Sequence, residues 1–236
     1  MNTVLITGAD RGLGFALTEE MLNHGWKVYA GQYMPEWNEL AGLKERWPDA
    51  LVLLPLDVSI GESIENAVKL IRADAGRLDM LISNAGINAA GEGGLDGELN
   101  TERTRLCFRV NSLAPLRLTQ VCLPLMENGM KRLCYVSSEA GSIAVCTREG
   151  ISGYCMSKTA LNMGVRLLYN ELRPKGYTFR LYHPGWLRTY MSGVKNTNGK
   201  LEAADSAKTA VRQFTEPRLY EDALEVLDWD DAAWPF

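Results

Sequence analysis

"TVLITGADRGLGFALTEEMLNHG", residues 3–25, decides the fold of this 236-residue chain. Residues 3–7 are apolar and β-branched, which favours a short buried strand. A glycine-rich stretch follows, and the apolar residues of FALTEEMLNHG then recur at helical spacing until a glycine ends the run. The stretch therefore predicts a strand, a tight turn and a helix.

The same alternation returns along the rest of the chain. Short apolar runs occur in WKVYAGQ, ALVLLPLD, LDMLISNAG, RLCYVSSEAG and YTFRLYHPG, with helical or loop stretches between them. Nearly continuous apolar strands between helices indicate a parallel sheet that is covered on both faces. We expect an α/β, Rossmann-type doubly wound parallel sheet of about seven strands. No linker or repeat interrupts the sequence, so residues 1–236 are predicted to form a single domain.

Composition excludes several classes of function. The net charge is -4 and no basic cluster occurs, so neither nucleic acid nor an anionic membrane is expected as a partner. Apolar runs are far shorter than the roughly 20 residues of a membrane span, and the first residues do not resemble a secretion signal. The 5 cysteines lack metal-type spacing and only 2 histidines occur, so no metal site is expected. We predict a cytoplasmic protein that acts on small molecules.

The glycine-rich turn is a candidate nucleotide site. Glycine lets backbone amides approach a pyrophosphate, and a helix N-terminus supplies unpaired N–H groups with a partial positive charge. The spacing differs from G-x-G-x-x-G, and a tight turn without a ligand is the alternative. Its place in the first strand–helix unit favours dinucleotide binding. The candidate residues are Gly8, Asp10, Arg11, Gly12, Leu13 and Gly14.

The end of the second predicted strand bears on the choice of cofactor. An NAD site of this type usually has an acidic residue there, but Gln32 and Tyr33 occupy the position. Without that carboxylate a 2′-phosphate is not repelled, and Arg11 could pair with it, although Arg11 could also be a solvated loop charge. We expect NADP(H) in preference to NAD(H), while NAD binding through Gln32 and Tyr33 stays open.

A tyrosine and a lysine stand four positions apart in ISGYCMSKTAL, residues 151–161. A helix would place Tyr154 and Lys158 on one face, one turn apart. A nearby ammonium lowers the pKa of a phenol, so such a tyrosine could exchange protons near neutral pH. The alternative is a surface tyrosine beside a solvated lysine, because two fixed positions often arise by chance.

Seven motifs occur in a characteristic order: TGADRGLG, LDVS, SNAG, VNSLAP, VSSEAG, YCMSK and HPGWLRT. The set resembles the common single-domain branch of the short-chain dehydrogenase/reductase family, from the first helix to about Thr189. The short tail, LEVLDWDDAAWPF, more loosely resembles the branch that includes the C-factor and sniffer-like carbonyl reductases.

The resemblance implies an NAD(P)-dependent oxidoreductase of the carbonyl reductase or alcohol dehydrogenase type. Such an enzyme transfers hydride between a nicotinamide and a carbonyl or alcohol substrate. The alternative is a sensor or scaffold that uses the fold to bind the cofactor without turnover, because fold does not imply function. The resemblance also implies a homodimer or homotetramer.

The resemblance further implies four catalytic roles. Tyr154 would be the acid/base, and Lys158 would lower the pKa of its phenol and bind the nicotinamide ribose. Ser138 would hold the substrate oxygen by a hydrogen bond. Asn111 would kink a long helix and hold a water on a proton relay to Lys158.

The serine assignment is complicated by spacing. The interval between Ser138 and Tyr154 is three residues longer than is usual in the family, which implies an insertion within residues 142–153. Ser137 and Ser142 therefore compete with Ser138 for the same role. We favour Ser138, because VSSEAG aligns with the family's Ser-Ser-x-x-Gly at the end of a strand.

The remaining cofactor contacts also come from the resemblance. LDVS would bind the adenine, NAG would line the adenine ribose, and the loop after the last strand would meet the nicotinamide carboxamide. A helix cap and a turn are the alternative roles of the first two motifs. The residues are Asp57, Val58, Asn84, Ala85, Gly86, Pro184, Gly185, Trp186 and Thr189.

Three long interruptions, residues 88–100, 142–153 and 189–205, follow the carboxyl ends of predicted strands. Ligands of open α/β sheets bind at that edge, so these loops are the expected substrate walls. The candidate pocket residues are Asn88, Glu92, Cys146, Trp186, Tyr190 and Met191.

Overall fold

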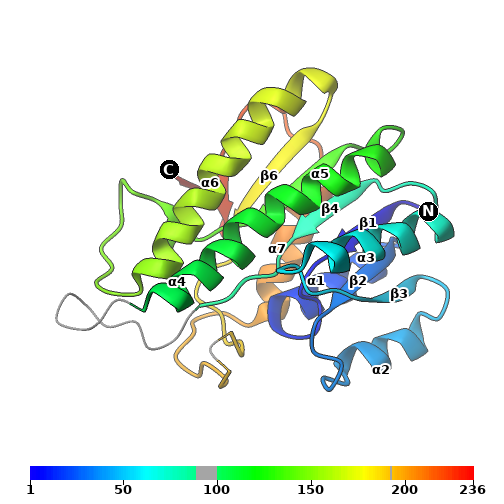
Figure 1. Ribbon diagram of the computed structural model, residues 1–236, viewed down its shortest axis with the longest axis horizontal. Coiled ribbons are helices and arrows are strands. Elements are labelled where there is room, and N and C mark those ends of the chain that lie inside the picture. Colours follow the sequence, from blue (N-terminus) through cyan, green and yellow to red (C-terminus); the bar gives the residue numbers. More distant parts are fainter. Residues whose placement is uncertain (89–99, 192) are drawn as a thin grey trace.

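Eight strands form one sheet in the computed structural model, which describes residues 1–88, 100–191 and 193–236 (Figure 1). In space the strands follow the order β3-β2-β1-β4-β5-β6-β7-β8. They are β1 (Thr3–Ile6), β2 (Lys27–Gln32), β3 (Leu51–Pro55), β4 (Met80–Ser83), β5 (Arg132–Val136), β6 (Thr178–His183), β7 (Val226–Asp228) and β8 (Ala233–Trp234).

The predicted doubly wound parallel sheet is confirmed. Strands β1 to β7 pair in parallel, and only β8 pairs with its neighbour β7 in the antiparallel sense. The expected strand number of about seven matches the parallel part, and β8 is the addition. A two-residue strand is too short to show any periodic pattern in the sequence.

Helices cover both faces of this sheet (Figure 1). The α-helices are α1 (Gly12–Asn23), α2 (Glu39–Arg46), α3 (Gly61–Asp74), α4 (Thr101–Phe108), α5 (Ala114–Met126), α6 (Ser152–Leu172) and α7 (Ala203–Thr215). A π-helix, η1 (Arg109–Leu113), joins α4 to α5, and two short 3-10 helices are η2 (Glu139–Gly141) and η3 (Arg173–Lys175).

Side chains of alternating direction divide the interior into two cores. In β1, Val4 and Ile6 face the core that is covered by α1, α2 and α7, whereas Leu5 faces the core that is covered by α3, α5 and α6. Because both faces are buried, the strands are apolar throughout rather than alternating. This explains why short continuous apolar runs in the sequence indicated buried strands.

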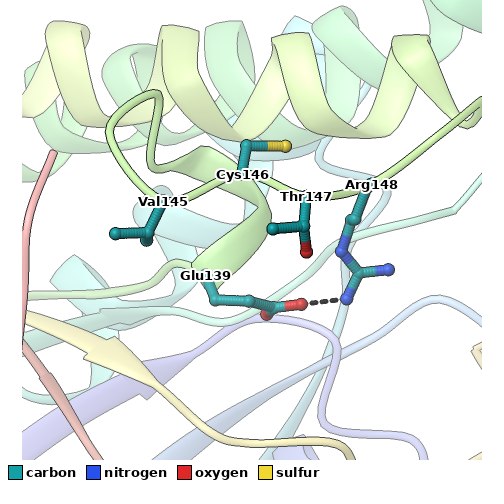
Figure 2. Close-up of a pocket in the computed structure, with 5 residues that line it drawn as sticks. All are labelled: Glu139, Val145, Cys146, Thr147 and Arg148. Atoms are coloured by element: carbon teal, nitrogen blue, oxygen red, sulfur yellow. Dashed lines mark hydrogen bonds and ion pairs between the residues drawn. The ribbon is translucent and has the colours of Figure 1, made fainter.

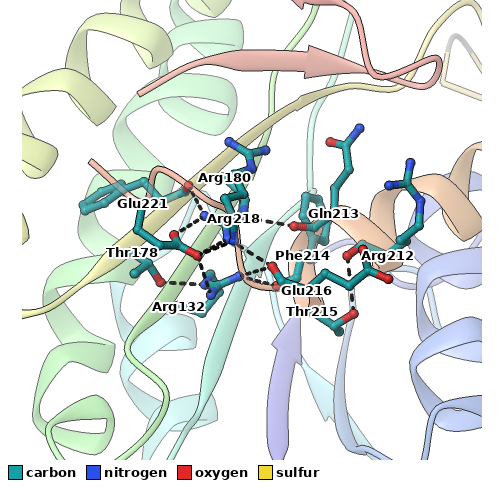
Figure 3. Close-up of polar contacts among 11 residues, drawn as sticks. Arg132, Thr178, Arg180, Arg212, Gln213, Phe214, Thr215, Glu216, Arg218 and Glu221 are labelled. Carbon is teal, nitrogen blue, oxygen red and sulfur yellow. Dashed lines mark hydrogen bonds and ion pairs between the residues drawn. The ribbon is translucent and has the colours of Figure 1, made fainter. Parts of the chain in front are cut away.

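Buried arginines tie the end of α7 to the sheet, at the edge where β5 and β6 begin (Figure 3). Arg180 is 1% exposed, and its two terminal nitrogens bond the two Glu221 oxygens at 2.7 Å each. Arg180 Nε donates to the Gln213 carbonyl at 2.9 Å, and Arg132 Nη1 donates to the Phe214 carbonyl at 2.7 Å. The guanidinium groups thus satisfy carbonyls that the helix end leaves open.

The charge balance of this cluster depends on Glu221. Arg218 lies beside Arg180, and its Nη1 and Nη2 are buried without a hydrogen-bond partner in the described part of the chain. Burial lowers the pKa of Arg218 to about 10. Burial alone would raise the pKa of Glu221, but hydrogen bonds from Arg180 and the Arg218 backbone outweigh it and bring that pKa to about 2.

Glu221→Gln is expected to lower the free energy of unfolding by about 3 kcal/mol, because it leaves buried arginines without their countercharge. The folded-state pKa of Glu221 is depressed, so its contribution is present above about pH 4.5 and is lost as the pH falls toward about 2. Urea unfolding at pH 7 and at low pH measures both effects. Glu216→Gln, on an exposed side chain of the same segment, is the control. Equal stability of the two variants would contradict the prediction.

Candidate active site

Four segments with predicted functional residues meet at the carboxyl edge of the sheet. Gly8 follows β1, Asn84 follows β4, Ser138 follows β5 and Pro184 follows β6. The strand order reverses between β1 and β4, which is the point where ligands bind in open α/β sheets. The fold thus brings together residues from four distant parts of the sequence.

The glycine turn has the geometry of an anion site. Gly8 and Gly12 adopt φ values of +63° and +59°, and a Cβ on Gly14 would lie 2.0 Å from the Gly8 carbonyl oxygen. Arg11 occupies the N-cap of α1, and within the described residues its side chain forms no capping hydrogen bond. The helix N-terminus is therefore open to a phosphate, and these residues fit a dinucleotide pyrophosphate.

Asp10 supports the neighbouring loop. Its Oδ1 accepts hydrogen bonds from the Tyr33 and Met34 amides at 2.8 Å each. The carboxylate thus fixes the chain where it leaves β2, and the Tyr33 side chain is exposed beside it. The adenine ribose binds at this point in Rossmann-type folds, and the role of Asp10 in cofactor binding stays a prediction.

An aromatic stack links three loops around the glycine turn. The Arg11 guanidinium lies 4.7 Å from the centroid of the Trp37 ring, and this ring contacts Tyr190 edge-on at 5.0 Å between centroids. Trp37 belongs to the loop after β2, and Tyr190 belongs to the segment after β6. These contacts hold the Arg11 guanidinium group against the loop that follows β2.

Asn84 and Asp57 both form local contacts. Asn84 Nδ2 donates to the Thr7 and Gly8 carbonyls at 2.8 and 3.1 Å, so it ties the end of β4 to the glycine turn. Asp57 Oδ1 accepts from the Ser59 amide at 2.8 Å. These are the turn roles that the sequence analysis gave as alternatives, and the cofactor roles of the two residues stay predictions.

Tyr154 and Lys158 lie one turn apart on α6, with Lys158 Nζ 5.9 Å from the centroid of the Tyr154 ring. Lys158 Nζ donates to the Val136 carbonyl at 2.9 Å. The lysine is 3% exposed, and burial lowers its pKa to about 8. The helix thus presents a phenol and an easily deprotonated amine at the end of β5.

The predicted direction of the Tyr154 pKa shift is wrong. The sequence analysis predicted that Lys158 lowers it, but burial raises the pKa above the ordinary value of tyrosine. A side-chain hydrogen bond with Ser138 and the charge of Arg148 act in the opposite direction without cancelling the burial effect. The sequence could not reveal this sign, because burial depends on packing around the phenol.

The three candidate serines have different partners. Ser138 shares a side-chain hydrogen bond with Tyr154. Ser137 Oγ donates to Asn162 Oδ1 at 2.7 Å, and Ser142 Oγ is buried with no hydrogen-bond partner among the described residues. The geometry therefore favours Ser138 as the serine that acts with Tyr154.

Asn111 lies in η1, where the π-helix interrupts the run from α4 to α5. Its Oδ1 accepts from the Ile87 amide at 2.8 Å, and its Nδ2 donates to the Ile87 carbonyl at 2.8 Å and to Ser157 Oγ at 2.9 Å. The carboxamide therefore clamps the chain beyond β4 against α6. The water relay to Lys158 stays a prediction.

The segment after β6 packs over the glycine turn. Gly185 has a φ of +80°, and a Cβ on it would lie 2.7 Å from the Trp229 ring. The Thr189 methyl group lies 3.1 Å from the position of a Cβ on Gly12. The predicted nicotinamide loop and the predicted phosphate loop thus touch each other, and Trp186, which belongs to the first of these loops, is 54% exposed.

The comparisons with known proteins agree with this geometry. The family model described as short chain dehydrogenase matches residues 2–200. The chain belongs to the short-chain dehydrogenase family. The C-signal protein of Myxococcus xanthus is 40% identical over 138 residues, which cover 58% of this chain and 80% of that protein.

Two solved structures are similar over the full length of this short-chain dehydrogenase. The NADPH-bound carbonyl reductase from chicken fatty liver matches with a TM-score of 0.88 and 27% identity, covering 100% of this chain and 99% of that one. The carbonyl reductase Sniffer of D. melanogaster matches with a TM-score of 0.90 and 25% identity, covering 100% of both chains.

A pocket of about 200 Å³ opens beside Ser138, and Figure 2 shows the residues that line it. Glu139 forms an ion pair with Arg148 across this pocket. Cys146 was predicted from the sequence to line the substrate pocket, but the charged residues Glu139 and Arg148 were not. The carboxylate directly after Ser138 in the sequence was the available signal. The lining residues are Glu139, Val145, Cys146, Thr147 and Arg148.

The other predicted wall residues of this dehydrogenase differ in their contacts and exposure. Tyr190 contacts Trp37, and Met191 is exposed. Asn88 has a buried side-chain oxygen without a hydrogen-bond partner in the described part of the chain. Glu92 and the rest of residues 89–99 lie outside the described residues.

The described residues contain neither a metal-binding cluster nor a membrane-spanning helix. No cluster of three His, Cys, Asp or Glu side chains there could hold a metal ion. In the same residues, no helix has both the length and the apolar character that a membrane crossing requires.

Lys158→Met is expected to raise the free energy of unfolding at pH 7 by about 1–3 kcal/mol, because a buried ammonium is removed at the loss of one hydrogen bond to Val136. The folded-state pKa of Lys158 is depressed to about 8 from 10.5, so the natural protein gains stability as the pH rises between these values. Thermal unfolding across this range should show the advantage of the variant shrinking. Lys208→Met, on an exposed lysine, is the control. A variant that is less stable at pH 7 would refute the burial argument.

Proposed function

We propose that this short-chain dehydrogenase is an NADP(H)-preferring oxidoreductase of the carbonyl reductase or alcohol dehydrogenase type, with a small-molecule carbonyl or alcohol substrate. The arrangement of Ser138, Tyr154 and Lys158 carries the proposal. The Tyr154 phenol shares a hydrogen bond with Ser138 and lies one turn from a buried lysine, at the edge that bears the glycine turn. These are the groups that carbonyl reduction needs at one place.

Each side chain has a distinct task in the proposed reaction. A bound nicotinamide would supply the hydride. Tyr154 donates its proton to the substrate oxygen, and its raised pKa keeps the phenol protonated at neutral pH. Ser138 orients the substrate oxygen, and Lys158 binds the ribose hydroxyls and recharges the phenol with a proton. Asn111 fixes the backbone next to this site and continues the proton route.

The preference for NADP(H) is supported by three observations. Gln32 ends β2 and Tyr33 follows it, at the position where an acidic residue would repel a 2′-phosphate. Arg11 lies over Trp37, in the loop that follows this strand. The similar chicken carbonyl reductase binds NADPH.

A homodimer or homotetramer is also part of the proposal. Large apolar side chains are exposed on neighbouring helices, namely Leu113 on η1 and Met156, Met163 and Leu167 on α6. Contact between two copies would cover them. A cytoplasmic location is supported by the odd number of cysteines, 5, and their unpaired spacing in the sequence.

Tyr154→Phe is expected to lower kcat for carbonyl reduction by about a factor of 100 to 10,000, because the proton donor is lost. The dissociation constant for NADPH should change by less than about threefold, since hydride transfer rather than binding needs the phenol. Fluorescence titration and NADPH oxidation with aldehydes, ketones and quinones measure the two effects. Tyr220→Phe, on an exposed tyrosine, is the control. Tight NADPH binding by the natural protein without turnover would instead support a sensor or scaffold.

Arg11→Ala is expected to raise KM for NADPH by about tenfold and to leave KM for NADH nearly unchanged, because only the 2′-phosphate needs the guanidinium. Steady-state kinetics with both cofactors measures the ratio. Arg46→Ala is a matched control, since Arg46 also lies over a tryptophan, Trp47, but at the end of α2. A natural protein that prefers NADH would overturn the cofactor proposal.

A further inference from the structure

The hydroxyl group of Ser138 has every hydrogen-bonding capacity occupied. Its Oγ donates to Glu139 Oε2 at 2.6 Å and accepts from the Ala140 amide at 3.1 Å. It also shares a hydrogen bond with Tyr154. A serine hydroxyl has one hydrogen and two lone pairs. Because Glu139 takes the hydrogen, the Ser138 hydroxyl has no second hydrogen to give to Tyr154 or to a substrate.

A substrate oxygen must therefore displace one of these partners. A carbonyl oxygen only accepts, so it needs the hydrogen that Glu139 holds. An alcohol can donate, so it can bind a lone pair of Ser138 while Glu139 stays in place. The two forms of one substrate thus compete with different partners of the same serine.

We propose that Glu139 is a specificity-determining positioning residue, which competes with carbonyl substrates for the Ser138 hydrogen and thereby favours the alcohol as the ligand of Ser138. The inference rests on the proposed function of this site. Glu139 acts through Ser138 and need not touch the substrate.

Two further groups face Glu139, and one of them, Arg148, holds it in this position. Arg148 pairs with Oε1 (Figure 2). The other carboxylate oxygen, Oε2, accepts the hydrogen bond from Ser138. His183 Nδ1 lies 3.6 Å from Oε2, beyond hydrogen-bond distance, and it is buried without a partner in the residues described. Burial lowers the pKa of His183 to about 4, so a neutral ring faces the carboxylate. His183 therefore does not draw Glu139 away from Ser138 at neutral pH.

The hydrogen bond from Ser138 to Glu139 also affects the ionisation of Tyr154 when no substrate is bound. While Glu139 takes the hydrogen, Ser138 lowers the pKa of Tyr154 only enough to offset part of the burial effect. Once Glu139 no longer takes the hydrogen, Ser138 can donate to the phenolate and stabilise the charged form. The other groups that act on Tyr154 are Arg148, Cys107 and Cys155, with Lys158 5.9 Å from the ring. A substitution at Glu139 leaves all of these in the chain.

The first experiment follows the ionisation of Tyr154 in the full-length protein. The near-ultraviolet absorbance of tyrosinate is titrated in the natural protein, Glu139→Gln, Ser138→Ala and the double variant, each corrected with its Tyr154→Phe counterpart. Glu139→Gln should move the ionisation to lower pH by about one unit, and Ser138→Ala should remove most of that shift. Glu149→Gln, an exposed carboxylate of the same loop, should cause none.

The second experiment compares KM for benzaldehyde with NADPH and for benzyl alcohol with NADP. Glu139→Gln should lower KM for the aldehyde about fivefold and leave that for the alcohol unchanged or higher, since a neutral amide holds the hydrogen less strongly than a carboxylate. Equal changes in both constants would overturn the inference. So would a tyrosinate shift that persists in the Ser138→Ala background.

The two experiments separate this inference from the proposed function. Turnover without coupling between Glu139 and Ser138 refutes the inference and leaves the oxidoreductase intact. Coupling in the titration with no turnover on any carbonyl supports the hydrogen-bond competition and refutes the enzyme.

Discussion

The contact on which the site depends is the close approach of α1 to the end of β1. A Cβ on Gly14 would lie 2.0 Å from the Gly8 carbonyl and 2.6 Å from Asn84 Nδ2, so only glycine permits it. This approach brings the open N-terminus of α1 to the carboxyl edge, and it lets Asn84 bond the glycine turn from β4. Thr189 then packs against Gly12 from the segment after β6. The position of the open helix N-terminus and its contacts with both loops follow from one steric condition.

Electrostatics divides the molecule between two edges of the sheet. At the amino edge, Arg132 and Arg180 are buried, and Glu221 with backbone carbonyls compensates their charge. At the carboxyl edge, Lys158 is also buried, but among the described residues its hydrogen-bond partner is one carbonyl, that of Val136, and its pKa is depressed. A buried charge with a countercharge stays ionised, whereas a buried charge without one changes protonation closer to neutral pH. Lys158 is of the second kind.

Local patterns predicted the features that depend on neighbours in sequence. The strand–turn–helix unit, the parallel sheet and the shared helix face of Tyr154 and Lys158 all follow from short-range spacing. Features that depend on packing were not predicted from the sequence. Burial reversed the expected sign of the Tyr154 pKa shift, and Arg180 meets Glu221 across 41 positions of sequence. Glu139 adjoins Ser138, yet only the coordinates show that it takes the serine hydrogen.

The parallel order of the sheet also has a consequence for how the chain comes to be folded. Neighbouring strands of a parallel sheet are joined by crossover connections. Val4 of β1 therefore cannot pair with Met80 of β4 until the residues between them have been synthesised. During synthesis from the N-terminus, Arg132 and Arg180 emerge before Glu221 does. Until that carboxylate is made, Arg132 and Arg180 lack their countercharge, and the positive charge at this end of the strands opposes association of unfinished chains. The segment that contains Glu221 then neutralises and buries this charge.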